Sequence, residues 1–257
     1  MHFDYGNSYK EKYKKTFYKD SSNQAKELIS KYYEECPFKG CGWLSPLDTA
    51  LLYSTIREHK PSNIMEVGCG YSTQVINYAC SKNKENFSLY SFSDKNIVQK
   101  KGFESSNFVK GHFFDSWENF KINLNTVDLL YIDAGHNSFF ALYYFFELME
   151  PLKSGSLIHI HDIACLEKYV EAIESGTFDL KHFSHTNGNY GVTDEAWTIY
   201  YLLNKFKNYE VLFCSSYLNE YYSNKLDFIT NIELGKFSNT KNEISFAPSS
   251  SLWLKKL

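Results

Sequence analysis

Apolar and polar positions follow two different periods along the chain. Before residue 61, apolar residues recur three to four positions apart in the segments 22–36 and 45–60, which is the spacing of amphipathic helices. Ser45 is a suitable N-cap for the second segment, and Pro46 suits the first helical position. We therefore expect residues 1–60 to form an N-terminal helical extension.

From residue 61 onward, short apolar segments alternate with longer amphipathic ones. The predicted strands are 63–68, 87–92, 107–111, 127–133, 156–162, 209–216 and 250–257, and the predicted helices are 72–80, 138–153 and 195–206. Apolar strands separated by helices are typical of a parallel sheet covered on both faces. No predicted helix separates the last two strands, which favours an antiparallel pair at the sheet edge. The predicted fold class for residues 61–257 is α/β, a doubly wound Rossmann-like sheet that is mostly parallel.

Composition and charge exclude several classes of protein. Lys+Arg 27 against Asp+Glu 30 gives a net charge of -3, whereas a nucleic-acid-binding domain is usually basic. No apolar run reaches the about 20 residues that span a bilayer, and residues 1–15 lack the apolar centre of a signal peptide. The six cysteines show no zinc-site spacing. We expect a cytoplasmic protein without nucleic-acid or membrane partners, and the 18% aromatic content is compatible with a homo-oligomer.

The turn after the first predicted strand contains Gly68 and Gly70 and precedes a helix. In an open α/β sheet such a turn lies at the carboxyl end of the strand, where ligands bind, and glycine lets a ligand cross it closely. A dinucleotide-binding fingerprint would place a third glycine or alanine where Thr73 stands. Glu66 precedes the turn and suits an ammonium group better than a pyrophosphate. The turn therefore favours S-adenosylmethionine over NAD.

The segment 66–73, EVGCGYST, resembles the first motif of class I S-adenosylmethionine-dependent methyltransferases. The stretch 127–163 resembles the branch found in bacterial surface-glycan and secondary-metabolite clusters, and the segments 209–218 and 249–257 are also similar to it. The resemblance covers about residues 43–257. It implies an O-methyltransferase that modifies a small polar acceptor, a sugar or glycan precursor, in polysaccharide biosynthesis.

The resemblance also implies which residues bind the cofactor. Around the glycine turn these are Glu66, Gly68, Cys69, Gly70, Tyr71 and Ser72, and further along the chain they include Asp133. Glu66 would hold the methionine ammonium directly or through water. Where the family usually has a ribose-binding acid, this chain has Ser93 followed by Asp94. Near the adenine, His112 replaces the usual acid, and Asp115 is the nearest carboxylate. These departures leave a non-catalytic binding or scaffold protein as the alternative.

Acids and histidines cluster where two predicted strands end. Asp133 and Asp162 end the strands, His136 follows the first, and His161 precedes Asp162. Because parallel strands end at the same edge of a sheet, we expect these four side chains to converge near the glycine turn. We expect His159, further inside the strand, to satisfy buried backbone groups.

Two chemical interpretations of this cluster compete. In the first, His136 or His161, together with Asp162, removes the proton of the acceptor hydroxyl. In the second, Asp133, His161 and Asp162 hold a divalent metal that favours the deprotonated acceptor. A histidine in that set suits manganese, iron or zinc better than magnesium.

Two features leave further alternatives open. The polar segment 164–192 either closes over the acceptor or forms a solvated loop. An NAD-dependent oxidoreductase is a further functional alternative. Thr73 and the lack of a clear acid at the end of the second strand count against it.

Overall fold

The computed structural model describes residues 20–40, 44–93, 106–110, 122–163, 191–226 and 249–257. The described α-helices are α2 (Ser22–Tyr32), α3 (Pro46–His59), α4 (Tyr71–Asn83), α6 (Ser138–Tyr143), α9 (Gly191–Lys205) and α10 (Ser215–Tyr222). The strands are β1 (Asn63–Val67), β2 (Ser88–Ser93), β3 (Ser106–Lys110), β4 (Leu129–Ile132), β5 (Leu157–Ile160), β6 (Tyr209–Cys214) and β7 (Leu252–Lys256). Short helical segments are η1 (Tyr33–Glu35), η3 (Leu124–Thr126), the π-helical η4 (Tyr144–Met149) and η5 (Ser223–Leu226).

The strands form one seven-stranded sheet in the order β3-β2-β1-β4-β5-β7-β6. The first five strands in that order pair in parallel, and β7 pairs antiparallel with both β5 and β6. The predicted α/β class, with its mostly parallel sheet and antiparallel C-terminal pair, is confirmed. The prediction gave no order within that pair: β7 lies between β5 and β6, and β6 is the edge strand.

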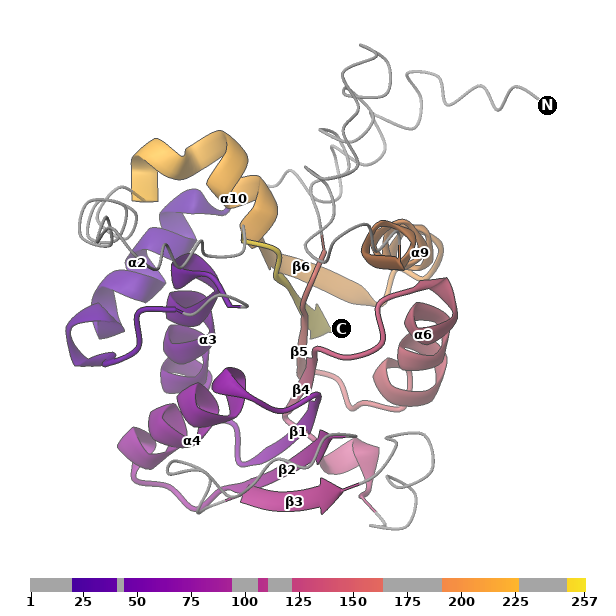
Figure 1. Ribbon diagram of the computed structural model, residues 1–257, viewed down its shortest axis with the longest axis horizontal. Coiled ribbons are helices and arrows are strands. Elements are labelled where there is room, and N and C mark those ends of the chain that lie inside the picture. The colour runs from indigo at the N-terminus through magenta and orange to yellow at the C-terminus, as the bar shows by residue number, and fades with distance from the viewer. Residues whose placement is uncertain (1–19, 41–43, 94–105, 111–121, 164–190, 227–248) are drawn as a thin grey trace, which may run out of the picture.

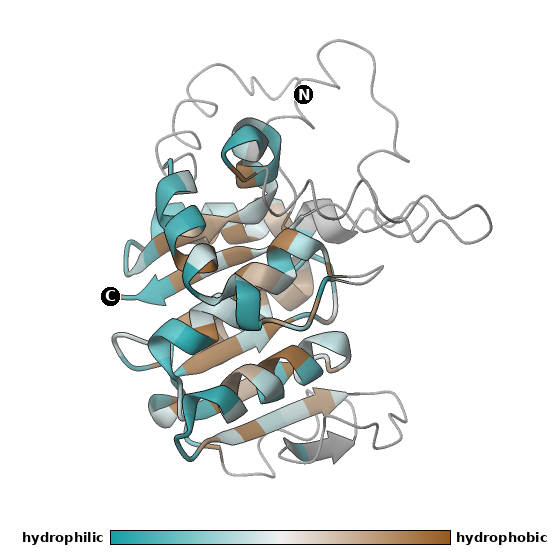
Figure 2. Cartoon of the chain, turned by 90° about the vertical axis from the view of Figure 1, so that its left-hand side faces the viewer, coloured by the Kyte–Doolittle hydropathy of each residue, from teal (hydrophilic) through white to brown (hydrophobic). Residues whose placement is uncertain are grey.

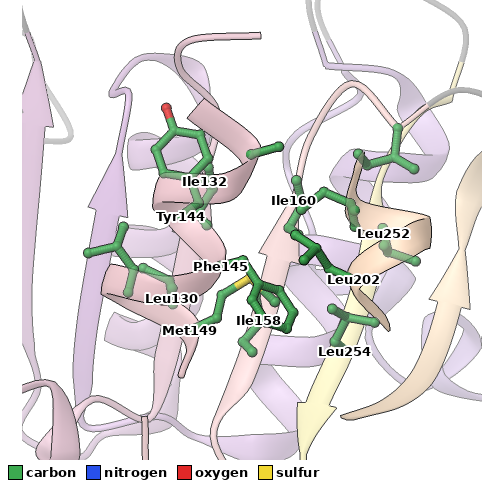
Figure 3. Packing of buried hydrophobic residues seen from close by; sticks show 14 of the residues in the cluster. Leu130, Ile132, Tyr144, Phe145, Met149, Ile158, Ile160, Leu202, Leu252 and Leu254 are labelled. Carbon is green, nitrogen blue, oxygen red and sulfur yellow. The ribbon is translucent and has the colours of Figure 1, made fainter. Parts of the chain in front are cut away.

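Helices cover both faces of the sheet (Figure 1). Helices α2, α3 and α4 lie on one face, and α6 and α9 lie on the other. The strands between them are largely apolar (Figure 2), as expected for strands that are buried on both sides. Figure 3 shows Ile132 of β4 and Ile158 and Ile160 of β5 packed beside Tyr144 and Phe145. This packing fixes the segment that follows β4 against the sheet.

Helix α3 begins as its sequence predicts. Ser45 Oγ accepts a hydrogen bond from the backbone nitrogen of Asp48 at 3.0 Å, and Pro46 is the first helical residue. The helix is buried along most of its length and shares one apolar cluster with α2, α4 and the strands. The boundary at residue 60 between a helical extension and the main domain stays a prediction.

Hydrogen bonds extend the parallel ladder past the ends of the central strands. Gly68 N donates to Phe92 O, Asp133 N to Val67 O, and His161 N to Ile132 O, at 2.8–2.9 Å. The segments that follow β1, β4 and β5 therefore lie side by side at the carboxyl ends of the parallel strands. Among the described helices, none is both long enough and apolar enough to cross a membrane.

Candidate functional site

The two glycines after β1 occupy different surroundings. Gly68 has a φ of +86°, and a Cβ placed on it would lie 2.0 Å from the carbonyl oxygen of Asp133. A Cβ on Gly70 would meet no atom within 4 Å. Gly68 is therefore required by the close approach of the segment after β4, whereas Gly70 borders open space that a ligand can fill.

Glu66, the acid of β1, holds the glycine turn together from inside the protein. Its carboxylate is fully buried and accepts hydrogen bonds from the hydroxyls of Ser72, Thr73 and Ser91 at 2.8, 2.8 and 2.6 Å. Thr73 Oγ1 also accepts a hydrogen bond from Gly70 N at 2.9 Å. Burial raises the pKa of Glu66 to about 7, although the three hydroxyls oppose the shift. This network joins β1, β2 and the start of α4.

The other predicted cofactor residues lie around this turn or outside the described residues. Tyr71 packs its ring edge-on against Phe38, with 5.7 Å between the ring centroids, and Cys69 is partly exposed. Ser93 ends β2 and is partly exposed. The residues outside the described ranges are Asp94, His112 and Asp115. Because hydroxyls occupy both oxygens of Glu66, its contact with a cofactor ammonium stays a prediction.

Three of the predicted acid and histidine side chains lie side by side beyond β4 and β5. His136 Nε2 lies 3.4 Å from Asp162 Oδ2 and 3.9 Å from Asp133 Oδ1. All three side chains are partly exposed. His161 is also close, with its Nε2 3.6 Å from Asp162 Oδ1, but its side chain is only 3% exposed. The structure therefore places His136 at the accessible part of the cluster and His161 behind Asp162.

Glu195 is a fifth member of this cluster, and it was not predicted from the sequence. It lies in α9, is 1% exposed, and its Oε2 lies 3.0 Å from His136 Nδ1. Helical spacing places Glu195 in line with the buried Ile199 and Leu202, four and seven positions later. An acid at a position of the apolar stripe was the signal that could have identified it.

Burial and the neighbouring charges shift the pKa values of the groups in the cluster. Burial by itself lowers the pKa of His136, but its hydrogen bond to Glu195 and the charges of Glu195, Asp162 and Asp133 raise it to about 9. Burial raises the pKa of Glu195 to about 7, against the opposing effect of His136. Burial likewise raises the pKa of Asp133, although His161 opposes the shift. The cluster therefore favours a positive charge among the three carboxyl groups.

The turn from Asp133 to Asn137 is held in place by the helix that follows it. Gly135 has a φ of +66°, and a Cβ there would lie 2.7 Å from the ring of Phe140. Tyr144 donates a hydrogen bond from its hydroxyl to the carbonyl of Ala134. Asn137 caps α6 by accepting a hydrogen bond from Phe140 N at 3.1 Å. These contacts fix the position of the His136 backbone, from which its side chain extends toward the cluster.

Contacts from Ser250, just before β7, hold Asp162 in place. It has a left-handed φ of +60°, which is uncommon for a residue other than glycine. Ser250 Oγ donates to Asp162 Oδ1 at 3.4 Å, and Ser250 O accepts from Ile163 N at 2.6 Å. The backbone nitrogen of Ser250 donates in turn to the buried carboxylate of Asp48 at 3.1 Å. The start of β7 thus links α3 to the acid at the end of β5.

His159 lies inside the sheet and has a structural role. Its ring stacks on Tyr131, with 4.2 Å between centroids, and meets Trp253 edge-on at 4.8 Å. Neither ring nitrogen has a hydrogen-bond partner among the described residues. Burial first, and then His161, lowers its pKa well below the ordinary value, so the ring is neutral. The structure thus shows aromatic packing instead of the expected hydrogen bonds to backbone groups.

The donor set of the cluster fits a divalent metal. Asp133, His136 and Asp162 each offer one ligand atom, and these atoms lie within 4.8 Å of one another. Two carboxylates and one imidazole suit manganese, iron or zinc better than magnesium. In this set His136 occupies the place that the sequence analysis gave to His161.

Comparison with known proteins places this site within a methyltransferase domain. Residues 65–163 match the family described as a methyltransferase domain, which confirms the prediction of an S-adenosylmethionine-dependent methyltransferase. The match includes the glycine turn, Asp133, His136 and Asp162. It does not test the predicted surface-glycan branch. No curated protein matches the chain.

Distant structural likenesses extend over more of the chain. An O-methyltransferase from Bacillus cereus in complex with S-adenosylhomocysteine (SAH) is 15% identical, with a TM-score of 0.49 over 74% of this chain and 81% of that one. An SAH-bound methyltransferase from Podospora anserina is also 15% identical, with a TM-score of 0.48 over 82% of this chain and 91% of that one. At these similarities we draw no conclusion about chemistry from either protein.

Proposed function

We propose that this chain, an enzyme whose S-adenosylmethionine-dependent methyltransferase domain includes residues 65–163, methylates a hydroxyl oxygen of a small polar acceptor. The observation that carries the proposal is that Asp133, His136 and Asp162 form a partly exposed cluster next to the glycine turn. S-adenosylmethionine supplies a methyl group that is already activated by its sulfonium. The protein must then align the acceptor oxygen with that methyl group and remove the hydroxyl proton.

The turn between β1 and α4 is the proposed site of the methyl donor. Gly70 borders open space, and the buried Glu66 fixes the turn by binding the hydroxyls of Ser72 and Thr73. Gly68, Cys69 and Gly70 would pass under the donor, with Tyr71 near its methionine part. Ser93, Asp94, His112 and Asp115 would lie toward its ribose and adenine.

The cluster beyond β4 and β5 is the proposed site of the acceptor hydroxyl. As the acceptor oxygen forms its bond to the methyl carbon, the carbon–sulfur bond breaks and its electron pair stays on sulfur. The hydroxyl proton passes to the cluster, where Nε2 of His136 is the proposed base in the neutral form of the ring. Because the pKa of His136 is raised to about 9, this form is the minority at pH 7 and its share increases as the pH rises toward 9. Asp162 lies 3.4 Å from that nitrogen and would stabilise the protonated ring. The buried His161 would support Asp162 from behind.

A divalent metal held by Asp133, His136 and Asp162 is the second way in which the cluster could activate the acceptor. The metal would supply a positive charge that lowers the pKa of a nearby hydroxyl. The ligand spacing supports this alternative. For the acceptor we propose a sugar or another glycan precursor, on the resemblance of the sequence over residues 127–163.

Calorimetric titration of the purified chain with S-adenosylmethionine, with and without manganese, tests the proposed donor site. We expect saturable binding, and an increase in affinity or heat with manganese would favour the metal. Absence of binding under both conditions would contradict the proposal and favour a non-catalytic protein with this fold. A Gly70→Val variant, which fills the open side of the turn, should bind the donor more weakly than the parent protein.

A further inference from the structure

We propose that Glu195 is a positioning residue for His136, holding the imidazole so that Nδ1–H donates to Glu195 and Nε2 faces Asp133 and Asp162. The role of His136 in the reaction rests on the proposed function, but the orientation of its ring does not. Glu195 comes from α9, 59 positions later in the chain.

The burial of Glu195 is the first argument for this role. Its side chain is 1% exposed, and its hydrogen bond within the described residues is the one to His136 Nδ1, at 3.0 Å. A carboxyl group buried beneath a helix is costly unless a charged or polar partner compensates for the lost water. At this stripe position an apolar residue would pack against the core without that cost. We therefore attribute the carboxyl group at this position to its hydrogen bond with His136, because core packing alone does not need an acid there.

The direction of the ring is the second argument. An imidazole bound through Nδ1 presents its other nitrogen on the opposite side, and Nε2 of His136 lies 3.4 Å from Asp162 and 3.9 Å from Asp133. A carboxylate that accepts the Nδ1 proton also selects the tautomer whose lone pair is on Nε2. Proton acceptance and metal binding at the partly exposed side of the cluster both require that lone pair.

The contacts around the His136 ring show that Glu195 is the residue that fixes the orientation of the imidazole. Gly135, Asn137 and Tyr144 fix the backbone before and after His136, as described above. They do not determine the rotation of the side chain. Helix α9 packs against α6 and brings Glu195 to the far side of the ring. Glu195 thereby fixes the rotation of a side chain whose backbone is already placed.

The experiment compares Glu195→Gln and Glu195→Ala with the parent protein. Glu150→Gln is the matched control, because Glu150 is a partly buried acid hydrogen-bonded to Tyr209 and Lys256 in a separate network. Nitrogen-15 NMR of labelled histidine identifies which ring nitrogen carries the proton, at an alkaline pH where the ring is neutral. A His136→Asn variant assigns the signal, and circular dichroism verifies that each variant is folded.

We expect the proton on Nδ1 in the parent protein and in Glu150→Gln, and a shift toward Nε2 in Glu195→Ala. Glu195→Gln, whose amide oxygen can still accept from Nδ1, should keep the parent tautomer. In the methyl-transfer assay, kcat should fall about 10–100-fold in the Glu195 variants, while the Kd for S-adenosylmethionine is unchanged. An unchanged histidine spectrum in folded Glu195→Ala would overturn the inference, even if the enzyme is active. A changed spectrum in a protein that transfers no methyl group would instead reject the proposed function and leave the positioning role intact.

Discussion

Gly68 and Gly70 differ in their surroundings, and single substitutions can separate packing from ligand binding. A Cβ on Gly68 would lie 2.0 Å from Asp133 O at a φ of +86°, whereas Gly70 has open space on its Cβ side. We expect Gly68→Ala to destabilise the fold by about 2 kcal/mol or more, because both the close contact and the backbone conformation oppose it.

Gly70→Ala should retain nearly the parent stability and lose affinity for S-adenosylmethionine, because its methyl group enters the space proposed for the donor. Urea denaturation and calorimetric titration of the two variants check this contrast. Equal losses of stability in the two variants would contradict the assignment of different roles to the two glycines.

Glu66 gives a prediction for the dependence of stability on pH. Its pKa is raised from 4.5 in the unfolded chain to about 7 in the fold, so between these values the folded state binds more protons than the unfolded state. The free energy of unfolding contributed by this group therefore falls as the pH rises from about 4.5 to 7 and stays low above that. The expected loss is about 3 kcal/mol.

Glu66→Gln removes this ionisation while its amide can still bond the hydroxyls of Ser72, Thr73 and Ser91. The variant should lose less stability than the parent protein between pH 5 and pH 8, as measured by chemical denaturation at both values. The exposed Glu147→Gln is the control and should behave as the parent protein. A Glu66→Gln profile that parallels the parent profile would show that Glu66 is not the group responsible.

At the scale of elements, helix α3 offers a test of the link between the N-terminal helices and the sheet. Ser45 Oγ caps this helix through Asp48 N and also lies 2.9 Å from Ser249 Oγ, next to the start of β7. Ser45→Ala should lower the free energy of unfolding by about 1–2 kcal/mol, because a capping bond and a buried contact are lost together. Thermal denaturation measures the effect, and Ser81→Ala, on the exposed surface of α4, should change little.

The sequence predicted the elements well where local signals are strong. The strand 127–133 is apolar apart from Asp128 near its start and ends at Asp133, and the N-cap at Ser45 has an unambiguous local pattern. Helix α10 was missed because its start, Ser215, directly follows β6 and was assigned to the strand. The insertion of β7 between β5 and β6 was also missed, because the order of strands depends on long-range pairing that no local pattern contains.

At the scale of the whole molecule, the order of the sheet explains where the site lies. The chain proceeds outward from β1 through β2 to β3 and then returns to β4 on the other side of β1. The strand order therefore reverses between β1 and β4, and open α/β sheets bind ligands at the carboxyl ends of the strands at such a reversal. The glycine turn and Asp133 occupy those two ends, so the fold alone brings them together.

The same topology accounts for which part of the site the sequence could predict. Asp133, His136 and Asp162 follow two predicted parallel strands, and their convergence was predicted because the carboxyl ends of parallel strands lie on the same side of a sheet. Glu195 comes from α9, which lies on the same face of the sheet as α6, and its approach to His136 depends on how these two helices pack against each other. His161 was assigned to the accessible cluster, but the side-chain packing leaves it nearly buried behind Asp162.

The most direct test of the account is transfer of an isotopically labelled methyl group from S-adenosylmethionine to a set of sugar and sugar-nucleotide acceptors, followed by mass spectrometry. We predict that the parent protein releases SAH and places the label on a hydroxyl oxygen. His136→Asn should bind the donor normally but transfer at least about 100-fold more slowly, because the proposed base is lost. His59→Asn, at the exposed end of α3, should act as the parent protein. Unchanged transfer by His136→Asn would contradict the role of the cluster, and no label in any acceptor would contradict the proposed reaction.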